Sequence, residues 1–316
     1  MDPSNSIKHS AEQLNSEVVR LATEGRLTEA LELSSQALTI DLYSPTAHYN
    51  RGLIFQNLAR YREAINSYTD SIRFDYQNAD AYLNRGNCYR ALGNLSDARD
   101  DYLRAIENRT DFVAAVFCLC STLHELENFD EAIDRLNSLI SKAENNVDAH
   151  VLLAMSYQRL ANFPKALKHF DIALSISPNQ LDALVNSAVI HEGLGNFSQA
   201  ESKLRLVTAL RPDLALAWTL LGSCLLSAGN FGAAESVLRK ALEVDDKNID
   251  AILKLSEVLL KREKKEAALQ QAVAAVNLDT SNYLAYLRLA NALQMLGNFS
   301  DALMNYNRAT ELCPGS

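Results

Sequence analysis

The residues of this sequence that could take part in chemistry are its cysteines and histidines, and their spacing keeps them apart. Cys118 and Cys120 are two residues apart, so on a helix they would point to different sides and could not bind one metal ion. The nearest approach to a zinc-protease helix is His124-Glu125, where Asn128 takes the place of the second histidine. No phosphate-binding glycine loop or nucleophile elbow occurs. We therefore expect no catalytic residue, no metal site and no cofactor.

The composition predicts a folded chain that avoids nucleic acid and membranes. Of the 316 residues, 48% are hydrophobic and 22% charged, enough apolar material for an ordered core. The net charge of -9 disfavours binding to phosphate backbones and anionic lipids. Residues 1–10 have no signal-peptide pattern and no long apolar run follows, so a cytoplasmic or alternatively nuclear location is expected. The five cysteines, an odd set without a CxxC pair, are expected to be mostly buried, reduced thiols.

An internal repeat of 34 residues organises the chain from Ala11 to Ser316 without a gap, after an N-terminal flank of residues 1–10. The twentieth position of every repeat is alanine, and the eighth is small in eight repeats, which indicates close backbone approach. Bulky residues recur at positions 4, 11 and 24, for example Trp218, Leu225 and Leu238. We expect one continuous array of nine repeats, at residues 11–44, 45–78, 79–112, 113–146, 147–180, 181–214, 215–248, 249–282 and 283–316.

Each repeat has the pattern of a helical hairpin. Its apolar residues recur at spacings of three and four, and the pattern resets at a turn such as Gly195-Asn196-Phe197. Glycine in that turn can supply the left-handed residue that ends the first helix. Pro178, Pro212 and Pro314, all at position 32, are expected to end the second helix. The fold class is therefore predicted to be all-α.

The period, the small-residue positions and the closing prolines together resemble the tetratricopeptide repeat (TPR) family over nearly the whole chain. The first repeat departs from the pattern with Glu17, Val18 and Ser34, and the eighth has Glu263-Lys264-Lys265 in place of the turn. The resemblance implies a right-handed α-solenoid superhelix of helix-turn-helix repeats. It also implies that the first helices line a concave groove in which a partner protein binds.

Helical spacing predicts which residues face this groove, because positions 2, 5, 6, 9, 12 and 13 share a face that avoids the core positions. In the fourth to seventh repeats this face is unusually apolar, and an exposed apolar patch usually marks an interaction site. We expect an extended peptide or a helix of a partner to bind there. The alternative is that these residues only widen the core between repeats. Among them are Phe117, Val151, Leu152, Met155, Val185 and Val189.

Asparagine and basic residues occupy the same predicted face. Asn50, Asn84 and Asn186 at position 6 resemble the asparagine ladder with which some TPR proteins hold a peptide backbone, although asparagine is also common there in the family pattern. Lys254, Lys261 and Arg288 could hold acidic residues of the partner, or they could form a solvated charged face.

These inferences predict a non-catalytic scaffold or adaptor that binds a partner protein in its groove. One alternative is that the chain is the substrate-recognition arm of a larger or truncated enzyme, such as a protein O-glycosyltransferase. A small-molecule sensor is a further alternative, but no insertion interrupts the period. Terminal repeats usually need a polar cap, and the ninth repeat ends without one. Leu303, Met304 and Leu312 are therefore expected to be partly exposed, which would permit end-to-end self-association.

Overall fold

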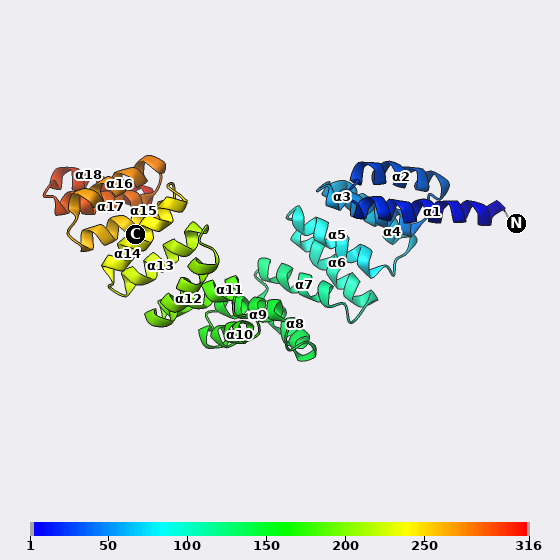
Figure 1. Cartoon of the computed structure of the whole chain (residues 1–316), viewed down its shortest axis with the longest axis horizontal. Helices are drawn as coiled ribbons and strands as arrows, with labels where there is room; N and C mark the ends of the chain where they lie inside the picture. Colours follow the sequence, from blue (N-terminus) through cyan, green and yellow to red (C-terminus); the bar gives the residue numbers. More distant parts are fainter. Residues whose placement is uncertain (1–2, 315–316) are drawn as a thin grey trace. The chain divides into compact units, whose positions relative to one another are not determined.

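The computed structural model describes residues 3–314, and within them it contains α-helices joined by short turns and no strand (Figure 1). The prediction of an all-α fold of helical hairpins is confirmed. The described chain forms two compact units, one ending at Asn162 and the other beginning at Phe163. Within each unit, consecutive helices pack against one another.

The helix boundaries follow the 34-residue period. The helices of the first unit are α1 (Pro3–Thr23), α2 (Leu27–Ile40), α3 (Pro45–Asn57), α4 (Tyr61–Phe74), α5 (Ala79–Ala91), α6 (Leu95–Asn108), α7 (Val113–Glu125), α8 (Phe129–Lys142) and α9 (Val147–Arg159). Those of the second unit are α10 (Phe163–Ile176), α11 (Leu181–Gly193), α12 (Phe197–Leu210), α13 (Ala215–Ser227), α14 (Phe231–Val244), α15 (Ile249–Lys261), α16 (Lys265–Leu278), α17 (Tyr283–Met295) and α18 (Phe299–Leu312). Because α1 begins at Pro3, residues 3–10 of the predicted flank extend the first helix.

The turn inside each repeat is made by a left-handed residue at position 15. At Gly195, for example, the backbone N–H bonds to the Glu192 carbonyl at 2.9 Å, and the next N–H bonds back to His191 at 2.8 Å. Such bonds satisfy the last carbonyls of the first helix. Five repeats use glycine and four use another residue: Gly25, Gly93, Gly195, Gly229 and Gly297, and Ala59, Glu127, Ala161 and Glu263. The second helices before Pro178, Pro212 and Pro314 end just ahead of these prolines, as predicted.

The core of each repeat is formed by small residues packed against large ones. The position-20 alanines from Ala30 to Ala302 are all buried. A Cβ on Gly86 would lie 2.7 Å from the ring of Tyr102, and one on Gly222 would lie 2.5 Å from Leu238. Positions 8 and 24 are therefore complementary in size, as the recurring small and bulky residues predicted.

Three of the five cysteines are buried in this core. Burial raises the pKa of Cys88 and of Cys120 to about 12 and that of Cys224 to about 11. These thiols therefore stay protonated at neutral pH and behave as small apolar side chains.

Candidate functional site

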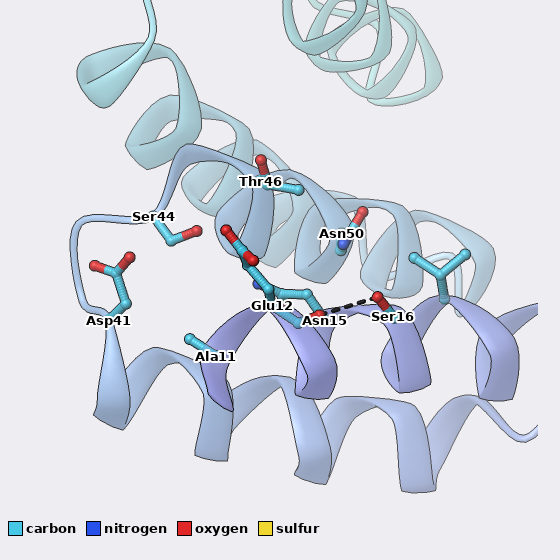
Figure 2. A pocket seen from close by; sticks show the side chains of 9 residues that line it. Ala11, Glu12, Asn15, Ser16, Asp41, Ser44, Thr46 and Asn50 are labelled. Atoms are coloured by element: carbon cyan, nitrogen blue, oxygen red, sulfur yellow. Dashed lines mark hydrogen bonds between the residues drawn. The ribbon is translucent and has the colours of Figure 1, made fainter. Parts of the chain in front are cut away.

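A depression of about 480 Å³ lies between the first helices of the first two repeats, α1 and α3, which contact one another (Figure 2). The loop before α3 adds Asp41 and Ser44 to its wall. Apart from Ala11, the helical lining residues occupy positions 2, 5, 6 and 9 of the first repeat and 2 and 6 of the second. These are positions that were predicted to face the groove. The helical residues are Ala11, Glu12, Asn15, Ser16, Val19, Thr46 and Asn50.

Two amide side chains in this depression lack hydrogen-bond partners. Asn50 is only 8% exposed, and no described residue hydrogen-bonds to its side chain. The Oδ1 atom of Asn15 is also buried without a partner among the described residues. A buried polar group left unsatisfied costs about 1–3 kcal/mol, so a ligand that hydrogen-bonds to the Asn15 Oδ1 would remove that cost. A peptide backbone offers both the N–H donors and the carbonyl acceptors that amides require.

The depression is acidic. Its lining includes Glu12 and Asp41 and, among the described residues, no lysine, arginine or histidine. Two of the three hydroxyls form hydrogen bonds within the chain. Ser16 donates to the Glu12 carbonyl at 3.0 Å (Figure 2), and Ser44 accepts from the Ala47 N–H at 3.3 Å. The groups left for a ligand are therefore the Thr46 hydroxyl, the amides and the carboxylates, and the carboxylates favour a ligand that carries positive charge.

The other two predicted asparagines are engaged inside the chain. The Asn84 Nδ2 donates to the Tyr49 hydroxyl at 3.0 Å, and the Asn186 Nδ2 donates to the Asp182 carbonyl of its own helix at 2.8 Å. Of the three predicted ladder residues, Asn50 alone is buried with a side chain that no described residue hydrogen-bonds.

The predicted apolar surface is partly core. Val151 and Leu152 are only 5% and 9% exposed, and Leu152 packs in a cluster with Cys120 and Leu136. These two residues are therefore not exposed as predicted, and their burial agrees with the alternative that they widen the core. For Leu152 the reason is that Cys120 of α7 and Leu136 of α8 pack against it.

The remaining apolar candidates are more accessible. Phe117, Met155 and Val185 are half-buried, while Val189 on α11 is 40% exposed. Phe117 packs against the same cluster as Leu152, and Val185 packs against a separate cluster around Leu184.

Two of the three predicted basic residues have partners within the second compact unit. The Lys254 ammonium donates to the Ser223 hydroxyl at 3.0 Å, and Ser223 in turn donates to Glu192 at 3.1 Å. Arg288 forms an ion pair with Glu257 at 2.5 Å. Lys261 is exposed and has no partner among the described residues. Arg288 is therefore neutralised by a carboxylate, whereas Lys254, which donates to a neutral hydroxyl, and Lys261 keep positive charge for an acidic partner.

Comparison with known proteins identifies the repeat. The family model described as tetratricopeptide repeat matches residues 49–111, 122–180, 186–249 and 253–316, and a second model of that description matches residues 225–275. The chain belongs to the tetratricopeptide repeat family. No curated protein is significantly similar to it in sequence.

Solved TPR structures share the fold at low sequence identity. A tetratricopeptide repeat protein from Parabacteroides merdae is 17% identical with a TM-score of 0.60, and the match covers 79% of this chain and 98% of that one. A chain of the APC/C hetero-tetramer Cut9–Hcn1 is 16% identical with a TM-score of 0.59, covering 92% and 57%. YrrB, described as a TPR protein with an unusual peptide-binding site, is 21% identical with a TM-score of 0.50, covering 58% and 95%. At these identities the likeness shows the fold alone.

This TPR chain also contains a recurring contact that its sequence did not predict. Where position 4 is His48, His150 or Trp218, a ring N–H donates to the backbone carbonyl six residues earlier, at 2.8, 3.0 and 2.9 Å. Each contact ties a first helix to the loop before it. Trp218 is only half-buried, less than its position suggested, and the Lys240 ammonium lies 5.1 Å from its ring centroid. The only signal in the sequence was a nitrogen-containing ring at the same position of three repeats.

Neither a metal site nor a membrane span is found among residues 3–314. No group of three or more histidine, cysteine, aspartate or glutamate side chains there is arranged to hold a metal ion. None of the described helices is both long and apolar enough to cross a bilayer.

Proposed function

We propose that this TPR protein is a non-catalytic scaffold that binds an extended, positively charged segment of a partner protein along its first helices. The observation that carries the proposal is Asn50, a buried residue in the acidic depression between α1 and α3 whose side chain forms no hydrogen bond with any described residue. An extended backbone could pair with this amide and with Asn15, while Glu12 and Asp41 attract lysine or arginine side chains. YrrB, which has the same fold, is described as having an unusual peptide-binding site, and this is consistent with the proposal.

The test is a peptide array probed with the full chain. Extended peptides of matched length would carry net charges from negative to positive, and we expect the basic peptides to bind best. Binding should weaken when Asn50→Leu and Asn15→Leu are combined, since two buried amides are lost. Asn186→Leu is the matched control, because its amide is bonded to its own helix. Preference for acidic peptides, or equal binding by wild type and the double variant, would refute the proposed site.

A second candidate function is self-association through α18. Phe299, Leu303 and Met304 are 68%, 61% and 60% exposed, and α17 is the only described helix that contacts α18. Burying these side chains against a second copy would remove apolar surface from water. Light scattering coupled to size exclusion tests this: a dimer that Leu303→Glu converts to a monomer supports the idea, and a strict monomer at high concentration rejects it.

A further inference from the structure

A second cavity, of about 330 Å³, lies outside the predicted groove. Its walls come from the end of α6, the following loop, the start of α7, and α8. Four of its nine lining residues are apolar, two are basic and one, Asp111, is acidic. The lining includes Ile106, Thr110, Val113, Val116, Leu139 and Lys142.

The cavity lies at the one repeat whose position 4 is occupied by valine. In three other repeats a ring at position 4 donates to the backbone carbonyl at position 32 of the preceding repeat. In the fourth repeat that carbonyl belongs to Thr110, and Val116 has neither the length nor the donor to reach it. Val116 is the smallest of the nine residues at this position, which are Leu14, His48, Tyr82, Val116, His150, Leu184, Trp218, Ile252 and Tyr286.

The Thr110 carbonyl is consequently unused. No described residue donates a hydrogen bond to it, whereas the equivalent carbonyl of Pro212 accepts the Trp218 Nε1–H at 2.9 Å. A ring that entered the cavity with an N–H donor could complete the contact that the other repeats make internally.

The charged side chains that line the cavity are Asp111, Arg135 and Lys142. Arg135 is paired with Glu131 at 2.8 Å, while Lys142 is exposed and has no partner among the described residues. In the seventh repeat a lysine likewise accompanies the ring, since Lys240 lies over Trp218. Lys142 is therefore free to hold an acidic group next to an inserted ring.

We infer that this cavity binds a tryptophan side chain of a partner protein, flanked by an acidic residue. The indole occupies the space that Val116 leaves open, its N–H donates to the Thr110 carbonyl, and the neighbouring carboxylate pairs with Lys142. The site is formed largely by second-helix residues, so it is a second contact surface that does not depend on peptide binding between α1 and α3.

Isothermal titration of the full chain with short blocked peptides tests this inference. The probe is acetyl-Gly-Trp-Glu-Gly-amide, compared with versions in which leucine replaces tryptophan or glutamine replaces glutamate. We expect saturable binding of the probe, about tenfold weaker binding without the indole, and several-fold weaker binding without the carboxylate. No saturable binding, or equal binding of the leucine version, would overturn the inference.

Substitutions in the protein test whether the probe binds in this cavity. Val116→Trp should fill the cavity with the chain's own ring and abolish probe binding, whereas Val244→Trp, which adds the same ring at an exposed position, should not. Lys142 lies on the surface, so Lys142→Glu should leave the fold intact. This variant therefore tests the site even if Val116→Trp does not fold. It should weaken the glutamate probe several-fold and leave the glutamine version unchanged. Equal binding of the glutamate probe by wild type and Lys142→Glu would contradict the inference.

Discussion

Tyr68 lies so close to Gly52 that a Cβ atom added to the glycine would come within 2.5 Å of the tyrosine Cε1. The ring is fully buried, and its hydroxyl donates to the Gln56 Oε1 at 2.7 Å, so it cannot move aside at low cost. In the first repeat the larger residue is instead at position 8, which is Val18, and the smaller one is at position 24, which is Ser34. Both are fully buried. The two positions can therefore share the space differently, and neither requires a particular residue.

Gly52→Ala should destabilise the protein by about 1–3 kcal/mol, because the added methyl overpacks the contact with Tyr68. Urea denaturation followed by circular dichroism would measure the change. Gly232→Ala is the control, since nothing lies within 4 Å of a Cβ at that helical glycine, and it should be neutral or slightly stabilising. If the two variants are equally stable, the space beside Gly52 can accept a methyl group, which would contradict the prediction.

Ala59→Gly should stabilise the second repeat. Ala59 has a φ of 56°, a left-handed conformation that costs an L-residue roughly 1–2 kcal/mol, only part of which is offset by the extra flexibility of glycine. We expect a gain of about 0.5–1 kcal/mol. The reverse change, Gly93→Ala at the same position of the third repeat (φ 79°), should cost a similar amount. Thermal melting would show whether each variant is more or less stable than wild type. A loss of stability in Ala59→Gly would contradict this account of the turn.

Glu235 should make the stability of the eighth repeat's turn depend on pH. Its carboxylate is 1% exposed and forms ion pairs with Arg239, Arg262 and Lys264, the last at 2.8 Å. Burial opposes ionisation of this group, but hydrogen bonds from Lys264 and Arg239 hold its pKa below the usual value. A lowered folded-state pKa stabilises the protein above the unfolded pKa of about 4.3, and this contribution is lost as the pH falls through the folded value.

Glu235→Gln should therefore cost about 1–3 kcal/mol at neutral pH, and the difference from wild type should shrink below about pH 4. Urea titrations at several pH values would show this convergence. Glu311→Gln removes a carboxylate from an exposed ion pair with Arg308 and should have almost no effect at any pH. If the difference in stability between wild type and Glu235→Gln stays constant down to acidic pH, the charge of Glu235 does not contribute to stability.

The sequence was sufficient to predict the hairpins because their determinants are local. A left-handed residue, a closing proline and small residues such as Ala64 recur at fixed positions, and the fold places them as expected. The eighth repeat shows where local rules are insufficient. Its turn lacks glycine, and it is held instead by Glu235, which belongs to the preceding repeat.

Predictions for the candidate site were less accurate, because surface exposure depends on what neighbouring helices contribute. The spacing placed Val151 and Asn50 on the same helix face, yet Val151 is core and Asn50 lines a depression. That depression needs Asp41 from a loop and Asn15 from another repeat, and a single helix face cannot reveal such a combination. The Thr110 carbonyl could not be predicted either, because the sequence does not show which backbone oxygens lack a hydrogen bond.

The contrast between Val151 and Val189 gives a direct test of this placement. Both occupy positions predicted to face the groove, but Val151 is buried and Val189 is 40% exposed. Val151→Asp would put an unpaired carboxylate among apolar side chains, which should cost several kcal/mol or prevent folding of that region. Val189→Asp should change stability by no more than about 0.5 kcal/mol, because water still solvates the new charge. Circular dichroism and thermal melting would distinguish the two variants. A stable Val151→Asp variant would indicate that Val151 is exposed and available to a partner.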